Sequence, residues 1–88
     1  MANIVVESGS YKNLSASGQV KASAGNLIGI FVASGSPTIK VWDSTAASGA
    51  ILVNTFQAAV GFWPIPANFT VGLYVTITGT ADITVFAT

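Results

Sequence analysis

The last seventeen residues, GLYVTITGTADITVFAT (72–88), alternate apolar and polar side chains almost one by one. Successive side chains of a β-strand point to opposite faces of the sheet, so this alternation gives a strand one apolar face. The chain carries no apolar stripe at the i, i+3, i+4 and i+7 spacing of an amphipathic helix, and Val, Ile, Thr and aromatic residues dominate it. The sequence therefore predicts an all-β protein.

Glycine recurs at intervals of roughly ten residues and divides the chain into short segments, as in sandwiches and barrels. We predict an antiparallel β-sandwich of seven to eight short strands, with a jelly roll as a candidate topology and a small closed β-barrel as the alternative. Residues 1–14 are expected to be an N-terminal arm or edge strand, with 3–8 as a candidate strand, and residues 15–88 a single β-sandwich domain. The predicted strands cover residues 15–22, 27–34, 38–43, 51–56, 62–65, 72–78 and 82–87.

The last two predicted strands allow a register to be proposed. A hairpin joined by residues 79–81 pairs Ile77 with Ile83 on the inner face and Tyr74 with Phe86 on the outer face. A shorter, two-residue connection would place an aspartate opposite Ile77 instead, and a slip of one residue moves every side chain to the wrong face. We therefore expect a cross-strand Tyr74–Phe86 pair on the surface.

Two other segments have distinctive patterns. Residues 27–34 are apolar on both faces, which is typical of a strand that is covered on both sides. Segment 62–66 contains Pro64 and Pro66, which cannot donate hydrogen bonds to a neighbouring strand, and so we place it at an edge. The predicted core consists of apolar residues on the inward faces of the strands: Ile28, Ile30, Val32, Ile39, Val41, Ile51, Val53, Leu73, Val75, Ile77, Ile83 and Val85.

The surface of such a sandwich is short of charge. Hydrophobic residues make up 51% of the chain and charged residues only 7%, and the net charge is zero. An ordinary soluble domain has roughly 25% charged residues, and a solitary small domain usually carries several net charges that oppose self-association. We favour a surface that is covered in part by other subunits over the alternative, a monomer coated in Ser, Thr, Asn and Gly.

Few residues are suited to catalysis. The chain has no His and no Cys, and arginine is also absent. Asp43 and Asp82 are the one pair of carboxylates that could be considered for glycoside hydrolysis, but each is more simply explained as bonding to backbone N–H groups of its own turn. We expect no enzyme activity, no cofactor and no bound metal, because thiolate, imidazole and clustered carboxylate ligands are missing.

Other classes of partner are also disfavoured. Three scattered lysines cannot hold a phosphate backbone, so we expect no nucleic-acid binding. The apolar runs are shorter than a membrane span, and the first residues lack the pattern of a signal peptide, so we expect no membrane association.

Outward aromatic residues are the best candidates for a functional surface. Alternation in segment 38–43 turns Lys40 and Trp42 outward, and the predicted terminal hairpin adds Tyr74 and Phe86 to this surface, with Trp63 as a further candidate. Aromatic residues anchor protein interfaces, but they also form platforms for sugar rings. We favour a contact between subunits over a glycan site, because few polar groups lie near these residues to fix sugar hydroxyls.

Three segments, AGNLIGIFV (24–32), TIKVWDSTAASGAILVNTF (38–56) and FWPIPANFTVGLYVTITGTADITVFAT (62–88), resemble small β-sandwich structural proteins of tailed bacteriophages. The shared features are a Gly-containing strand, an aspartate followed by a Ser/Ala/Gly loop, the tripeptide NTF, an edge proline and the terminal hairpin. The resemblance covers roughly three quarters of the chain and leaves residues 1–14 unmatched.

The resemblance implies a structural protein of the virion, of the head decoration or cement type, that stabilises the capsid through contacts between subunits. It implies a capsid-surface location after synthesis in the bacterial cytoplasm, with the major capsid protein or another virion protein as partner. It also implies a homo-oligomer, and a trimer is favoured by analogy with the quasi-threefold sites of shells. A tail or fibre component and a glycan-binding module on the virion surface are the alternatives, and no catalytic residues carry over.

Overall fold

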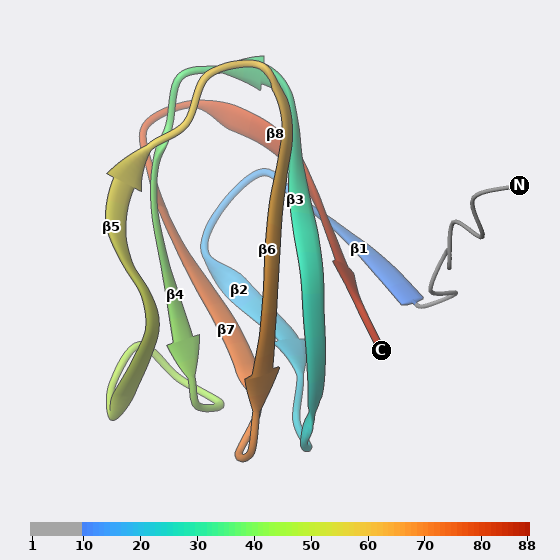
Figure 1. The fold of residues 1–88 in the computed structure, drawn as a ribbon. Coiled ribbons are helices and arrows are strands. Elements are labelled where there is room, and N and C mark those ends of the chain that lie inside the picture. Colours follow the sequence, from blue (N-terminus) through green and yellow to red (C-terminus); the bar gives the residue numbers. More distant parts are fainter. Residues whose placement is uncertain (1–9) are drawn as a thin grey trace, which may run out of the picture.

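The computed structural model describes residues 10–88, which form eight antiparallel strands in two four-stranded sheets (Figure 1). Sheet A has the strand order β1-β8-β3-β6, and sheet B has the order β2-β7-β4-β5. The two sheets remain separate and do not close into a barrel, which confirms the predicted sandwich. The strands are β1 (Ser10–Leu14), β2 (Gly18–Lys21), β3 (Gly25–Gly35), β4 (Thr38–Asp43), β5 (Ala50–Gln57), β6 (Gly61–Phe69), β7 (Leu73–Thr78) and β8 (Ala81–Ala87).

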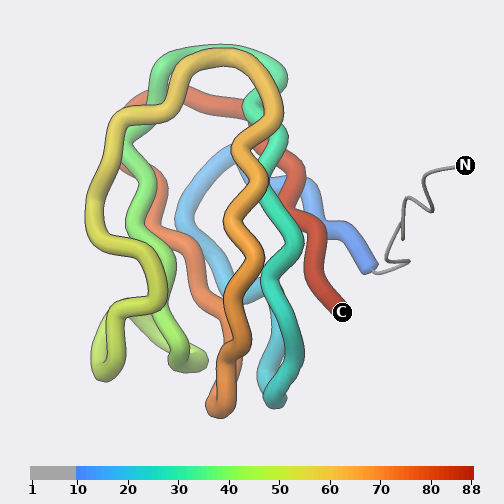
Figure 2. The backbone as a smooth tube through the Cα atoms, viewed as in Figure 1, coloured from blue at the N-terminus to red at the C-terminus, as the bar shows by residue number. Residues whose placement is uncertain are grey.

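The topology is that of a jelly roll. Strand β1 pairs with β8, β2 with β7, β3 with β6, and β4 with β5, so the first half of the chain runs antiparallel to the second half. Every connection except that between β4 and β5 passes from one sheet to the other, as the backbone trace in Figure 2 shows. This wrapping of a long folded hairpin into two sheets is the double Greek key of jelly-roll proteins.

The predicted terminal hairpin is wrong. Strands β7 and β8 follow each other closely in sequence, but β7 belongs to sheet B and β8 to sheet A. Tyr74 lies opposite Trp42 of β4, whereas Phe86 lies opposite Tyr11 of β1, so the predicted Tyr74–Phe86 pair does not form. Alternation identifies the inward face of each strand. It does not show whether two consecutive strands are neighbours in one sheet or face each other across the core from different sheets.

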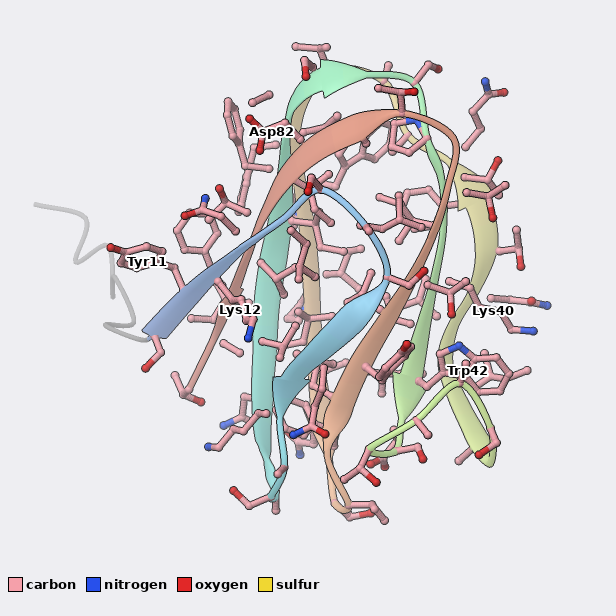
Figure 3. The ribbon with its side chains drawn as sticks, turned by 180° about the vertical axis from the view of Figure 1, so that it is seen from behind. Tyr11, Lys12, Lys40, Trp42 and Asp82 are labelled. Carbon is pink, nitrogen blue, oxygen red and sulfur yellow. The ribbon has the colours of Figure 1, made fainter. Side chains whose placement is uncertain are left out.

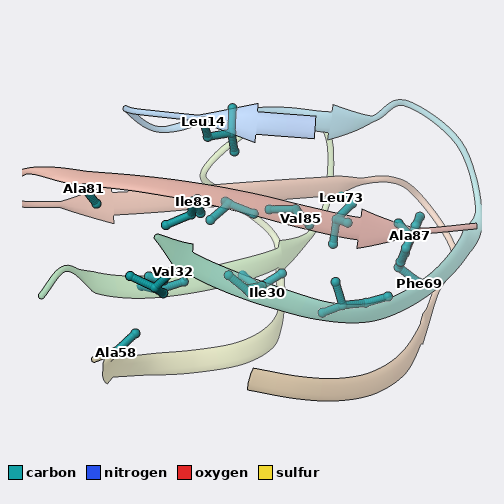
Figure 4. Close-up of a cluster of buried hydrophobic side chains, with 14 residues drawn as sticks. Leu14, Ile30, Val32, Ala58, Phe69, Leu73, Ala81, Ile83, Val85 and Ala87 are labelled. Carbon is teal, nitrogen blue, oxygen red and sulfur yellow. The ribbon is translucent and has the colours of Figure 1, made fainter. Parts of the chain in front are cut away.

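The core lies between the sheets and receives side chains from both (Figure 4). Ile77 and Val53 of the predicted core are partly buried and pack against it. The predicted core residues that are confirmed as buried are Ile30, Val32, Ile39, Val41, Leu73, Val75, Ile83 and Val85, and those that the sequence did not predict are Leu14, Leu27, Ala58, Phe69, Ala81 and Ala87.

A β-bulge explains why Ile28 is not in the core. The register of β3 shifts between Leu27 and Gly29 against both β6 and β8. One extra residue reverses the alternation at that point, so Leu27 is buried at 1% exposure and Ile28 is only partly buried. The other wrong core residue, Ile51, lies opposite Trp42 after a similar shift between β4 and β5, and it is 48% exposed.

Strands β1 and β6 form the two edges of sheet A. The predicted strand at 62–65 falls in the first half of the longer β6, which lies at an edge of sheet A, as its prolines required. At the other edge of sheet A lies β1, formed by residues 10–14. The candidate strand at 3–8 lies outside the described residues.

Asp43 joins the end of β4 to the loop between β6 and β7. Its carboxylate accepts hydrogen bonds from the backbone N–H groups of Thr70 (3.0 Å), Val71 (2.8 Å) and Gly72 (3.4 Å), and from the Thr70 hydroxyl (3.1 Å). The expectation that Asp43 bonds to its own turn is therefore wrong. These hydrogen bonds lower the pKa of Asp43 because they stabilise its ionised form. The N–H of Val71 has the largest effect and the N–H of Thr70 the next largest.

Replacing Asp43 by Asn tests this connection. In the folded protein the pKa of Asp43 is lower than in the unfolded chain, so its contribution to stability is complete above pH about 4 and is lost as the pH falls through the folded-state pKa. We expect Asp43→Asn to lower the melting temperature at neutral pH. We also expect the melting temperature of this variant to fall less than that of the wild-type chain when the pH is lowered. Thermal unfolding at a series of pH values measures both, and Asp82→Asn, at an exposed carboxylate, serves as the control.

Candidate functional site

The outer face of sheet B carries a row of side chains that crosses all four strands. Gln19 of β2 lies opposite Tyr74 of β7, Tyr74 opposite Trp42 of β4, and Trp42 opposite Ile51 of β5. Lys40 lies two residues before Trp42 on the same face of β4. Three of the five predicted site residues, Lys40, Trp42 and Tyr74, therefore lie together on this face.

Trp42 is held in place by two polar neighbours. Its indole Nε1 donates a hydrogen bond of 2.9 Å to the hydroxyl of Thr76, and the ammonium of Lys40 lies 4.4 Å from the ring centroid (Figure 3). The ammonium is attracted to the negative face of the indole and covers it. A sugar ring that stacks on Trp42 would have to displace Lys40 or use the other side of a ring that is already partly buried.

Phe86 belongs to a different surface, the outer face of sheet A. Here Tyr11 of β1, Phe86 of β8, Phe31 of β3 and Phe62 of β6 place aromatic rings on every strand of the sheet. We call these four residues the aromatic face. Tyr11 is 70% exposed, Phe62 51% and Phe31 40%. The chain itself therefore leaves the outer side of β3 open at Phe31, and a cover on both sides of residues 27–34 stays a prediction that depends on a partner.

Two contacts order the aromatic face. The rings of Phe62 and Phe86 meet edge to face, with centroids 6.2 Å apart and an interplanar angle of 68°. Between their strands lies Gly29, where an added Cβ atom would be 2.6 Å from Cζ of Phe62 and 2.8 Å from the carbonyl oxygen of Trp63. The absence of a side chain at Gly29 thus lets the Phe62 ring lie against the backbone of β3.

Trp63 is not part of either outer face. Its ring packs against Phe56 of β5 with centroids 5.8 Å apart, and its Nε1 donates a hydrogen bond of 2.9 Å to the carbonyl of Ala59. Trp63 therefore helps to close the β5–β6 side of the sandwich against the core. Of the predicted site residues, it is the one whose contacts are mainly structural.

Sequence reasoning missed Tyr11, Phe31 and Phe62 as members of one surface. The alternation in segment 27–34 does place Phe31 opposite the core side chains, and the glycine two residues earlier is a signal of close approach. The pairing of β3 with β6 and of β8 with β1 brings these rings together, and it joins segments that are far apart in the sequence.

The remaining polar groups are dispersed over the described residues. Asp43 ends β4 of sheet B, whereas Asp82 lies in β8 of sheet A near the opposite end of the sandwich (Figure 3). Within residues 10–88, no three His, Cys, Asp or Glu side chains come together as metal ligands. A pocket of about 200 Å³ opens between β1 and β2 beside Lys12 and Lys21, and Lys21 donates a hydrogen bond of 2.9 Å to the backbone oxygen of Thr88.

Comparison of the chain with protein-family models, with curated proteins and with solved structures finds no match. The part of the chain that the structure describes contains no helix with the length and hydrophobicity of a membrane span. The resemblance to phage structural proteins therefore stays a prediction from the sequence pattern.

Replacing Gly29 by Ala tests the packing of the aromatic face. The added methyl group meets the Phe62 ring and a backbone oxygen, so we expect a loss of about 1–3 kcal/mol in the free energy of unfolding, the usual cost of overpacking. Denaturant unfolding measures this loss. It should shrink in a Phe62→Ala background, where the ring is absent, and an equal loss in both backgrounds would contradict the contact.

Proposed function

We propose that this chain is a non-enzymatic structural protein of a tailed-phage particle that decorates the capsid and stabilises the shell through contacts between subunits. The observation that carries the proposal is the aromatic face: uncharged aromatic side chains on all four strands of sheet A, exposed on β1, β3 and β6 and partly buried on β8. Aromatic residues are enriched and charged residues depleted at the centres of protein interfaces. The resemblance to phage structural proteins supplies the setting.

The energetics of such a surface suit a repeated structural contact. Burying apolar surface contributes about 25 cal/mol per Å² before the costs of association are subtracted. The contribution of one small domain is modest, but a shell binds many copies, and the contributions of independent copies add. A decoration protein therefore requires an apolar contact surface and a rigid frame. The jelly roll provides the frame, and it is also used by viral capsid and lectin domains.

The proposed partners follow from the same surface. Copies of this chain and the major capsid protein or another virion protein are the candidates, with three copies expected where the site is a quasi-threefold axis. A place in the tail or a fibre would use the same fold and the same kind of contact, and it differs only in location.

A glycan-binding module is the second candidate, and the row on sheet B favours it. Trp42 and Tyr74 are direct cross-strand partners, and Gln19, Lys40 and Thr76 supply polar groups beside them. Against this, Lys40 covers the ring of Trp42 at 4.4 Å and the Trp42 Nε1 is already bonded to Thr76. We therefore favour the structural role.

Purified virus particles test the structural role directly. We expect mass spectrometry to detect the chain in particles of the phage that encodes it, and we expect mild denaturant to release it with the shell still closed. Adding the purified chain back should restore both its presence and the heat resistance of the shell. Absence of the chain from intact particles, or its presence in isolated tails alone, would contradict a role in capsid decoration.

Glycan binding has its own test. If sheet B held a sugar site, the wild-type chain would bind oligosaccharides on an array and Trp42→Ala would abolish the signal. We expect no signal that depends on Trp42, because the ring face is covered. Thr78→Ala, at an exposed position of the same sheet beyond the row, is the matched control for a general change of the surface.

A further inference from the structure

We infer that the side of the sandwich between β1 and β2 binds an extended, acidic segment of a partner protein. The segment adds to sheet A beside the edge strand β1, and the carboxylate of one of its side chains enters the pocket that Lys12 and Lys21 line. The inference goes beyond the proposed function, because it assigns a second site and the chemistry of its ligand.

The distribution of lysine is the first observation. The whole chain has three lysines and no arginine, and Lys40 lies over the ring of Trp42. The other two, Lys12 and Lys21, line the same pocket of about 200 Å³, although they belong to different sheets. No Asp or Glu side chain among residues 10–88 lines this pocket. The charge of the pocket therefore selects an anionic group as its ligand.

Both lysines occupy inward positions of their strands. Lys12 lies opposite Val85 of β8, and Lys21 lies opposite Leu73 of β7; both partners are fully buried. Residues directly opposite each other on neighbouring strands share a face, so each lysine projects on the core side of its sheet. Figure 3 shows Lys12 on the side of β1 that is turned towards β2. The two ammonium groups thus stand where the core of the sandwich opens to solvent.

The opposite side of the sandwich is closed in another way. There the rings of Phe56 and Trp63 pack together between β5 and β6. Apolar closure is therefore available to this fold, and the β1–β2 side has charged groups around a cavity in its place.

The hydrogen bonds of the two ammonium groups leave donors for a ligand. Each ammonium group has three N–H donors. Lys21 uses one of them in a bond of 2.9 Å to the Thr88 oxygen, which the backbone N–H of Asn26 also binds at 3.3 Å. Lys12 donates no hydrogen bond to any of the described residues. Lys21 is thus fixed against sheet A, and Lys12 provides the ammonium group that the described residues leave unpaired.

The backbone of β1 selects an extended segment over a free anion. An edge strand directs part of its N–H and C=O groups outward, where another strand can pair with them. Of the other three edges, β6 contains Pro64 and Pro66, and β2 and β5 are interrupted by shifts of register. Strand β1 pairs with β8 in one register from Ser10 to Leu14, and no strand within residues 10–88 pairs with its other edge.

The geometry of strand addition places a side chain of the partner in the pocket. In a strand added beside β1, the residue opposite Lys12 shares its face and therefore points inward. The methylene groups of a glutamate at this position can contact Val20 and Ala87, and its two carboxylate oxygens can accept hydrogen bonds from Lys12 and Lys21. The pocket is smaller than the roughly 300–1,000 Å³ of small-molecule sites, which suits one side chain of a longer segment.

Titration of the isotope-labelled chain with capped pentapeptides tests the inference. The peptides have the pattern T-x-E-x-T with an apolar residue at each x, and a matched set has Gln in place of Glu. We expect the Glu peptides to shift the amide NMR signals of β1 and Lys21 with dissociation constants of about 10 µM to 1 mM. The Gln peptides should bind roughly tenfold more weakly, since they lack the charged acceptor. Equal binding of the two sets, or binding of neither, would overturn the inference.

Variants of the lysines separate the pocket from the net charge of the chain. Lys12→Gln should weaken binding of the Glu peptides roughly tenfold, whereas Lys12→Arg should retain it. Lys40→Gln makes the same change of charge on the outer face of sheet B and should leave binding unchanged. If Lys12 only keeps β1 from pairing with other strands, Lys12→Gln will instead strengthen binding, which would contradict the site. The NMR spectrum of each variant shows whether it is folded.

Strand addition has a test that leaves the charge unchanged. Alternate N–H groups of an added strand face β1, so N-methylation of alternate peptide amides should abolish binding in one phase and preserve it in the other. Equal binding in both phases would exclude pairing with β1. Sodium acetate that shifts the same signals with the same dissociation constant as the peptides would reduce the site to one for a free carboxylate, and it would overturn the assignment to a partner segment.

Discussion

Packing of two apolar sheet faces against each other is the interaction on which the rest of this structure depends. Side chains such as Ile30 and Val85 from sheet A and Ile39 and Val75 from sheet B are fully buried between the sheets, and the described residues leave no buried polar side chain without a partner. Each sheet has only one inner face, so every strand must present its apolar residues on alternate positions. The jelly-roll path meets this requirement by delivering successive strands to the two sheets in turn.

A side chain on a strand of this sandwich points either into the core or to one of the two outer faces, and a bulge in the strand changes which. The bulge at Leu27–Gly29 sends Leu27 inward, whereas Gly29 keeps the outward side that alternation from Ile30 gives it, and there the Phe62 ring covers it. The irregularity thus adds Leu27 to the core next to the point where the Phe62 ring lies on the backbone of β3. Core packing and surface chemistry are set by one residue of register.

The two outer faces differ in how far their side chains are already paired within the chain. Sheet B combines Trp42 and Tyr74 with polar neighbours that already satisfy the indole, whereas sheet A presents aromatic rings and no adjacent charge. Polar groups that are paired within the chain have little to gain from a partner. Exposed rings gain by leaving water, so the aromatic face is the surface whose chemistry most clearly calls for a second molecule.

The sequence by itself determined the fold class, because alternation of Val, Ile and Thr has a period of two and admits only strands with one apolar face. It also determined most of the core, including Ile39 and Leu73, and the edge position of the proline-containing β6, since these depend on the residue and its immediate neighbours. Only the tertiary structure decided that β7 and β8 belong to different sheets and that Tyr11, Phe31, Phe62 and Phe86 share a face. Pairing between distant strands is chosen by the free energy of the whole packed sandwich, and no local pattern in a single strand contains it.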